Sequence, residues 1–488
     1  MRHDICIIGA GADGLAAAAT LAARGLKVVV VERDSHSGGC CVTREFYPGF
    51  RASPYADELP AIPSDIFRAL DLARRGAILV PQSSSLALWS DRQHLVLPWA
   101  LSGAALSQTD SLRCAIVSRV FADAEARPKR GWFVSRRAAA SWPGDEYATR
   151  SLADVLTDSP SDPGTTAHRM AARLAGQVCD SALGGSALHL LSGTPGGMAA
   201  GGLGRLGDAL RAAAEDAGAE ISCGLEVSDL KRKNGRVTGI GLADGSELAA
   251  RAVISTLDLK RTFLSLFRWS ELPRAVVDRV ANFRGSPGTA RLLLALSAPP
   301  DLPAGTDRLA QRGPIYISPD MRDEAYRAWR SGAVPQHMPL TVRIVSATDP
   351  SLAPDGAACM TVTLGAVPHT PFDGTWTREK RDRLREAALA AIEAVLPGTS
   401  ARVIGAELIV PPDIENQLGT TDGDLSGGEI AADQMLGQRP FIGYGGTRTP
   451  VDGLYLAGPS STLGPLATCV SGVAAAHAVM TDLGVGNP

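Results

Sequence analysis

The amino-acid sequence predicts an α/β fold, because short buried strands and alanine-rich helical stretches alternate at both ends of the chain. Residues 4–8 form an apolar, mostly β-branched run that is typical of a strand buried on both faces. A glycine-rich turn and an alanine-rich stretch ending at Gly25 follow, and 27–31 predict a second buried strand. This order of strand, helix and strand, within about 30 residues, has the size of one parallel crossover unit.

The turn after the first strand has the spacing of a dinucleotide-binding loop. The first glycine of the pattern GxGxxG permits a tight turn, the second lets the backbone approach a pyrophosphate, and the third lets the helix pack on the sheet. The N-terminus of that helix adds free N–H groups and a partial positive charge. The six residues that fit the pattern are Gly9, Ala10, Gly11, Ala12, Asp13 and Gly14.

Glu32 ends the second strand, 18 residues after Gly14. A carboxylate there can accept hydrogen bonds from both ribose hydroxyls of an adenosine, and it repels a 2′-phosphate, which disfavours NADP. Gly38 and Gly39 follow, and a glycine pair allows a second close approach of backbone to the dinucleotide; a plain surface turn is the alternative. Taken alone, the loop leaves NAD and FAD open.

Length and composition set the class of protein. A chain of 488 residues predicts two or three domains, and 45% hydrophobic with 20% charged residues is typical of a soluble protein. A net charge of −3 without a strongly basic stretch disfavours a nucleic-acid partner. We expect no membrane span and no secretory signal. Eight scattered cysteines without a CxxC pair predict no metal site and favour a reducing, cytoplasmic location.

The middle of the chain predicts a β-rich second domain. Proline-bounded strands are expected at 290–296, 340–346 and 359–364, and a charged amphipathic helix at 378–396. Residues 100–195 show little periodicity, and no element is predicted there. The end returns to α/β, with a strand at 454–457 and a helix from about Gly472.

Several blocks resemble the phytoene-desaturase-like branch of the FAD-dependent amine oxidase superfamily. The blocks are 4–11, 32–33, 38–39, 42–43, 46–50, 201–210, 218–227, 252–256, 448–458 and 471–473. The resemblance implies FAD as the cofactor and a Rossmann-type FAD-binding domain beside a mixed β-sheet substrate domain with a helical cap. It implies that 1–50, 196–260 and 411–488 form the first domain, and that 51–195 and 261–410 form the second.

The resemblance also implies residue roles around the cofactor. The backbone of Val227 would face the adenine, and Thr256 would end the strand that returns to the nucleotide. The segment from Gly458 to Gly472 would bring a helix N-terminus to the flavin pyrimidine ring, where its dipole stabilises a reduced anionic flavin; an ordinary docking helix is the alternative. The family histidine is absent from 461–469. The loop, Glu32, Gly38 and Gly39 already belong to the predicted cofactor site. The resemblance adds seven residues to it, namely Arg33, Cys40, Val227, Thr256, Gly458, Gly472 and Val473.

Other candidates for chemistry are few. The eight histidines are scattered, and His477 is expected to be a surface or core residue rather than a base. The acidic stretch from Asp413 to Asp424 is expected to be a solvated loop, and a flavin thioether at Cys40 or Cys469 is a minor alternative. Catalytic residues are left unassigned, which fits a desaturation because the flavin itself carries the hydride chemistry.

The resemblance implies an FAD-dependent dehydrogenase or desaturase that removes hydride from a C–H bond of a lipophilic or secondary-metabolite substrate and forms a double bond. An amine oxidase forming C=N is an alternative, disfavoured by 5% aromatic residues and few lysines. A lipid carrier of the Rab GDP-dissociation-inhibitor type and a simple NAD dehydrogenase are further alternatives. Expected partners are a small organic substrate, oxygen or a quinone as electron acceptor, and a peripheral membrane contact through the cap if the substrate is lipophilic.

Overall fold

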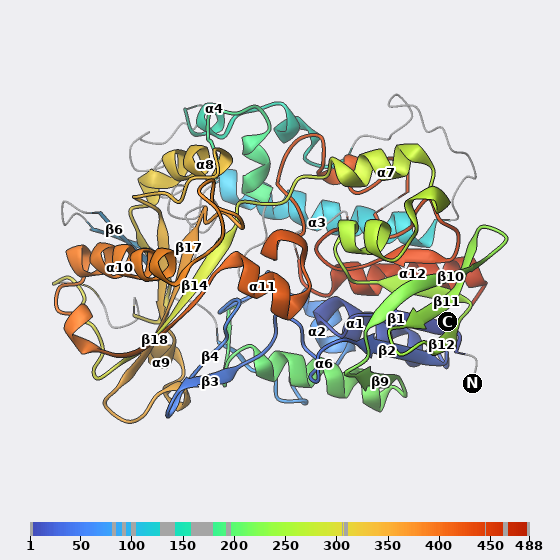
Figure 1. Ribbon diagram of the computed structural model, residues 1–488, viewed down its shortest axis with the longest axis horizontal. Coiled ribbons are helices and arrows are strands. Elements are labelled where there is room, and N and C mark those ends of the chain that lie inside the picture. Colours follow the sequence, from blue (N-terminus) through green and yellow to red (C-terminus); the bar gives the residue numbers. More distant parts are fainter. Residues whose placement is uncertain are drawn as a thin grey trace.

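A parallel five-stranded sheet and a mixed seven-stranded sheet occupy the two sides of the molecule, with helix α11 (Pro411–Leu418) between them (Figure 1). The computed structural model describes residues 3–80, 84–89, 94–98, 104–126, 142–157, 179–191, 197–304, 306, 311–444, 446–461 and 467–485.

The five-stranded sheet is assembled from three distant segments of the chain. Every pairing in it is parallel, in the order β19 (Leu454–Leu456), β13 (Ala252–Ser255), β1 (Ile5–Ile8), β2 (Val28–Glu32) and β9 (Glu220–Cys223). Ile5 and Ile7 pack into a different core from Cys6 and Ile8, so β1 is buried on both faces as predicted. The sheet therefore joins three parts of the sequence that resemble the FAD-dependent family.

Helices cover one face of this sheet and a small second sheet covers the other. The helices are α1 (Ala12–Ala22), α6 (Gly204–Asp216) and α12 (Val470–Leu483), with α3 (Ala104–Glu125) packed on α12. The second sheet contains β10 (Val227–Lys233), β11 (Arg236–Leu242) and β12 (Glu247–Ala249), with α7 (Arg274–Ala281) nearby. A Cβ atom on Gly472 would lie 2.0 Å from the carbonyl oxygen of Asp13, so α12 and α1 meet at a glycine.

The seven-stranded sheet has one apolar face and one face that carries both polar and apolar side chains. Its order is β18 (Val403–Ile409), β14 (Thr289–Leu296), β17 (Ala358–Gly365), β16 (Leu340–Ile344), β15 (Ile315–Ile317), β6 (Ser84–Leu88) and β7 (His94–Pro98). Helix α10 (Arg378–Val395) packs on the apolar face. The strand registers bring the polar side chains to the other face, namely Arg291, Tyr316, Thr341, Arg343, Thr361 and Thr363.

Shorter elements complete the described chain. The helices are α2 (Ser64–Ala69), α4 (Leu152–Thr157), α8 (Arg322–Arg330) and α9 (Val345–Thr348). The two-stranded sheets pair β3 (Arg44–Tyr47) with β4 (Phe50–Ala52) and β5 (Leu79–Val80) with β8 (Met198–Ala199).

Helix α3 lies in the stretch for which the sequence supported no prediction. Two expectations about local structure were wrong. The strand expected at 340–346 ends at Ile344 and gives way to α9. The acidic stretch is not a solvated loop, because Asp413 accepts a hydrogen bond from Val410 N at 3.0 Å at the start of α11. Asp424 is held by the backbone N–H groups of Ser286 and Ser426, and burial raises its pKa.

The loop 53–60 lies against the face of the seven-stranded sheet opposite α10 and is fixed there by two ion pairs. Arg291 Nη2 donates to Asp57 Oδ1 at 2.8 Å, and their side chains are 2% and 6% exposed. Thr361 donates to the same oxygen at 2.9 Å. Next along the loop, Glu58 pairs with Arg343, whose side chain is 3% exposed. The chain leaving the nucleotide-binding segment is thus attached directly to the other sheet.

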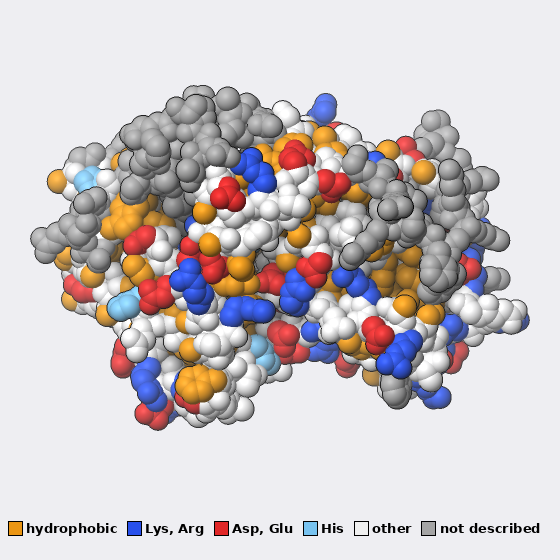
Figure 2. Space-filling view, turned by 90° about the horizontal axis from the view of Figure 1, so that it is seen from above, with side chains coloured by type: hydrophobic (Ala, Val, Ile, Leu, Met, Phe, Trp, Pro, Cys, Tyr) orange, Lys and Arg blue, Asp and Glu red, His pale blue; other side chains and the backbone are white. Residues whose placement is uncertain are grey.

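Charges of both signs are mixed on the described surface. Figure 2 shows positive and negative side chains interspersed over the part of this face that is described. Among the described residues, no helix is both long enough and apolar enough to cross a bilayer.

Breaking the buried ion pair between Arg291 and Asp57 is expected to destabilise the protein. Replacing Arg291 by methionine leaves Asp57 charged and without its main partner, which is expected to cost about 3–5 kcal/mol of the free energy of unfolding. Urea unfolding followed by circular dichroism measures this change. The double variant with Asp57→Leu is expected to recover part of the loss.

Arg378→Met is the matched control, because Arg378 lies 3.9 Å from Asp382 in a pair whose arginine is 97% exposed. Its free energy of unfolding is expected to be unchanged within error, because an exposed ion pair contributes little. An equal loss in both variants would contradict a special role for the buried pair.

Candidate functional site

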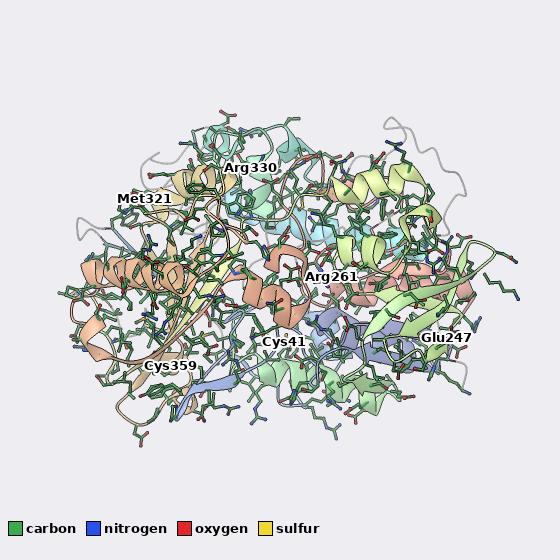
Figure 3. The ribbon with its side chains drawn as sticks, in the orientation of Figure 1. Cys41, Glu247, Arg261, Met321, Arg330 and Cys359 are labelled. Atoms are coloured by element: carbon green, nitrogen blue, oxygen red, sulfur yellow. The ribbon has the colours of Figure 1, made fainter. Side chains whose placement is uncertain are left out.

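A cavity of about 860 Å³ lies between the two large sheets. The described lining includes the β1–α1 loop, the end of β2, the start of β10, loop 53–60, strands β15 and β16, and residues from 417–427, 458–460 and 467–468. Cys41 and Arg261, which both line it, lie in the middle of the molecule (Figure 3). A ligand in this cavity contacts both sheets.

The glycine-rich loop forms part of the cavity wall. Gly9 has a positive φ of 95°, and a Cβ atom on Gly14 would lie 2.1 Å from the Gly9 carbonyl oxygen. A Cβ atom on Gly11 would meet no protein atom within 4 Å. Gly9 and Gly14 are therefore required by the packing of the loop itself, whereas Gly11 opens space on the cavity side, as expected for backbone that approaches a pyrophosphate.

Glu32 is held at the edge of the cavity with a fixed orientation. Its Oε2 accepts a hydrogen bond from Ala10 N at 2.7 Å, and its Oε1 accepts one from Asp34 N at 2.9 Å. Val227 and its neighbours in the chain line the cavity beside it. This arrangement fits a ribose and an adenine, because a carboxylate accepts from ribose hydroxyls and the β10 backbone lies alongside.

Helix α11 closes the cavity near the same end. Arg33 Nη2 donates to the carbonyl oxygens of Asn416 and Gln417, at 3.1 and 2.7 Å. A guanidinium there satisfies carbonyl groups that the C-terminus of a helix leaves free. Arg33, Gln417 and Leu418 all line the cavity, so this contact fixes one wall of the site.

The third segment reaches the loop through Asp13. Ser471 Oγ donates to Asp13 Oδ1 at 2.6 Å, and Gly472 N donates to the same oxygen at 3.1 Å. Ser471 Oγ in turn accepts from Gly458 N at 2.7 Å. Burial raises the pKa of Asp13, against the two hydrogen bonds, which lower it. The start of α12 therefore donates to a protein carboxylate at the edge of the cavity.

Burial shifts the pKa values of some titratable groups in and next to the cavity wall. The pKa of the Cys40 thiol rises to about 11, and burial also raises the pKa of Cys469. A thiol kept protonated in this way is a poor nucleophile, which disfavours the thioether alternative. Burial and the nearby Arg322 lower the pKa of His189 to about 3, so this ring is neutral at physiological pH.

The structure brings most of the predicted cofactor residues to one surface. The lining includes Gly9, Gly11, Ala12, Asp13, Glu32, Arg33, Gly38, Gly39, Cys40, Val227, Thr256 and Gly458. Ala10, Gly14 and Gly472 lie behind this surface and contact it, and Val473 is buried in α12. Their roles toward the cofactor stay predictions. His477 makes a surface contact with Glu125, 3.2 Å from its carboxylate.

Sequence reasoning missed the far end of the cavity. Glu58, His189, Tyr316 and Thr341 line it, and they come from four separate segments. No motif joins them, so only the paired strands β15 and β16 and the loop 53–60 bring them together.

Two family models match the chain. A model of the NAD(P)-binding Rossmann-like domain matches residues 7–57, and the model of the flavin containing amine oxidoreductase matches 167–480. The second match covers more than half of the chain, and this protein therefore belongs to the flavin-containing amine oxidoreductase family. The residues around the cavity fit FAD, because the wall contains a glycine next to open space and an oriented carboxylate.

Similar proteins agree with this assignment. Pyridine nucleotide-disulfide oxidoreductase domain-containing protein 2 of Rattus norvegicus is 27% identical over 99% of this chain and 94% of its own length. A neurosporene-forming phytoene desaturase of Rhodobacter capsulatus is 26% identical over 53% of this chain and 48% of its own. Cyclohexylamine oxidase from Brevibacterium oxydans has the same fold, with a TM-score of 0.59 at 15% identity over 99% and 100% of the two chains.

This protein is an FAD-dependent oxidoreductase of the amine oxidase superfamily, with a desaturase-like branch among its relatives. The predictions of fold class, cofactor and enzymatic character are confirmed. The carrier and NAD-dehydrogenase alternatives are therefore set aside.

The two loop glycines are expected to respond differently to a methyl group. Gly11→Ala places it in open space on the cavity side, so the apoprotein is expected to fold normally and to lose FAD. Gly14→Ala places it against the Gly9 carbonyl, so the fold itself is expected to suffer. Melting temperature and the FAD content of purified protein separate the two effects. Normal FAD content in Gly11→Ala would contradict the pyrophosphate role.

The carboxylate of Asp13 is expected to lower stability at neutral pH. Because its pKa is raised in the folded protein, the cost is absent below the unfolded-chain pKa and complete above the folded-state pKa. Asp13→Asn keeps an Oδ1 acceptor for Ser471 and Gly472. The apoprotein variant is expected to melt above the native apoprotein at about pH 8, with a smaller difference at about pH 5. A pH-independent difference would show that the raised pKa is not its source.

Proposed function

We propose that this protein is a desaturase that removes hydride from a C–H bond of a lipophilic or secondary-metabolite substrate and leaves a double bond. The observation that carries the proposal is the lining of the far end of the cavity. Ala56, Leu59, Pro60 and Leu190 give it apolar walls. Names among the relatives include a phytoene desaturase and a prolycopene isomerase, which supports a polyene-like substrate.

The same lining disfavours C=N formation. An aromatic cage and a lysine–water bridge to the flavin are the usual signs of an amine oxidase. Among the described lining residues there is no lysine, and Tyr316 is the one aromatic ring apart from histidine. The solved amine oxidases share the fold at 15% identity or less, which supports no transfer of their substrates.

FAD, when bound, supplies the hydride acceptor. The chain supplies the surroundings. The glycine-rich loop and Glu32 bind the nucleotide half, and loop 53–60 with β15 and β16 forms the wall that orients the substrate. Ion pairing of this loop to the sheet keeps that wall rigid, and the apolar side chains exclude water from the reacting carbon.

Anaerobic flavin bleaching tests the proposal. The purified holoprotein is expected to absorb at about 450 nm and to bleach with at least one member of a set of lipophilic substrates that contains phytoene in detergent micelles and 2-octanone. Gly11→Ala protein, which is expected to lack FAD, is the control for non-specific spectral change. Peroxide production with cyclohexylamine, without bleaching by phytoene, would instead favour the amine oxidase alternative.

A further inference from the structure

Glu58 has a distinct position among the acids of the cavity. Glu32 accepts hydrogen bonds from backbone N–H groups, and Asp13 accepts them from the start of α12. Asp424 accepts them from the backbone of Ser286 and Ser426. Asp258 accepts from Thr421 and Arg261 N. Glu58 is the described lining carboxylate that stands on the seven-stranded sheet, away from the nucleotide loop.

Two hydroxyl groups lie on the same patch of sheet. Thr341 is two residues before Arg343 on β16, so both point to one face about 7 Å apart along the strand. Tyr316 is directly opposite Thr341 on β15, where facing Cβ atoms are about 5 Å apart. Both hydroxyl residues line the cavity. The carboxylate that Arg343 holds and the two hydroxyls therefore border one small region.

One donor in this region, on Arg343, has no hydrogen-bond acceptor. Arg343 Nη2 donates to Glu58 Oε1. Its Nη1 is buried and has no hydrogen-bond partner among the described residues. A buried donor without an acceptor is costly, so an oxygen atom supplied by a ligand would stabilise this corner.

A carboxylate beside hydrogen-bond donors suits one kind of C–H bond. A carboxylate is too weak a base for a hydrocarbon, but it can remove the proton next to a carbonyl whose oxygen accepts hydrogen bonds. His189, the other basic group at this end, is neutral because burial and Arg322 lower its pKa to about 3, so it holds a proton poorly.

We propose that Glu58 is a catalytic base and that the substrate carries a carbonyl group next to the bond that is desaturated. This inference rests on the proposed desaturase function and narrows its substrate class. The Glu58 carboxylate takes the proton from the carbon next to the carbonyl, and the electron pair of that C–H bond becomes the new C=C bond. The neighbouring carbon loses hydride to FAD, so the products are an α,β-unsaturated carbonyl compound, reduced cofactor and a protonated Glu58.

The test separates proton removal from hydride transfer. The holoenzyme is incubated in D₂O with cyclohexanone or 2-octanone, and exchange of the α-hydrogens is followed by NMR. Wild-type protein is expected to exchange them about a hundredfold faster than Glu58→Gln, which keeps a hydrogen-bonding partner for Arg343. Glu58→Asp, which keeps the charge, is expected to fall between them. The wild-type rate is expected to rise with pH and level off when the carboxylate is ionised.

Matched measurements exclude a merely structural effect. The FAD absorbance and melting temperature of each variant are compared with wild type, and Glu58→Asp replaces Glu58→Gln if the latter loses FAD. Equal exchange in wild type and the FAD-retaining variants would overturn the proposal, and so would no wild-type exchange above buffer with either ketone. Bleaching by phytoene in that case would leave the desaturase proposal standing, which distinguishes the two failures.

Discussion

Two buried ion pairs hold the functional site together. Arg291 with Asp57 and Arg343 with Glu58 attach loop 53–60 to the face of the seven-stranded sheet opposite α10. That loop is the direct continuation of the nucleotide-binding segment. Because a charge in a dry environment needs its partner, the pairs fix how the two sheets face each other. The cavity lies between the sheets in that arrangement.

The same pairs explain why several polar side chains of this sheet point inward. Threonines, arginines and a tyrosine on β14 to β17 would be costly to bury against an apolar partner. Here they meet acids and a cavity, while the alternate residues of the same strands pack under α10. One face of this sheet stabilises the fold by packing under α10, and the other contributes to the cavity. The proposed base and the two hydroxyl residues lie on the cavity face.

At the nucleotide end, the constraint is close backbone packing. Gly9, Gly14 and Gly472 each stand where a methyl group would collide with backbone or a neighbouring side chain. Asp13 then links the first and third segments through Ser471 and Gly472. The start of α12, which the sequence placed toward the flavin, donates to this carboxylate. The electrostatic effect of this helix N-terminus on a cofactor would therefore be combined with that of the Asp13 carboxylate.

The sequence by itself determined the nucleotide-binding unit, because GxGxxG, the flanking strands and Glu32 are local features with local geometry. The hydrophobic patterns of strands and helices also predicted the positions of β14, β17, α10 and α12 to within about two residues. Only the tertiary structure decided the substrate end. In the sequence, Glu58 is one acidic residue in a loop, and nothing marks it as part of a site. Its ion-pair partner Arg343 is 285 positions away in the chain. Sheet pairing over such distances leaves no periodic trace, so Tyr316, Thr341 and His189 became neighbours only in the fold.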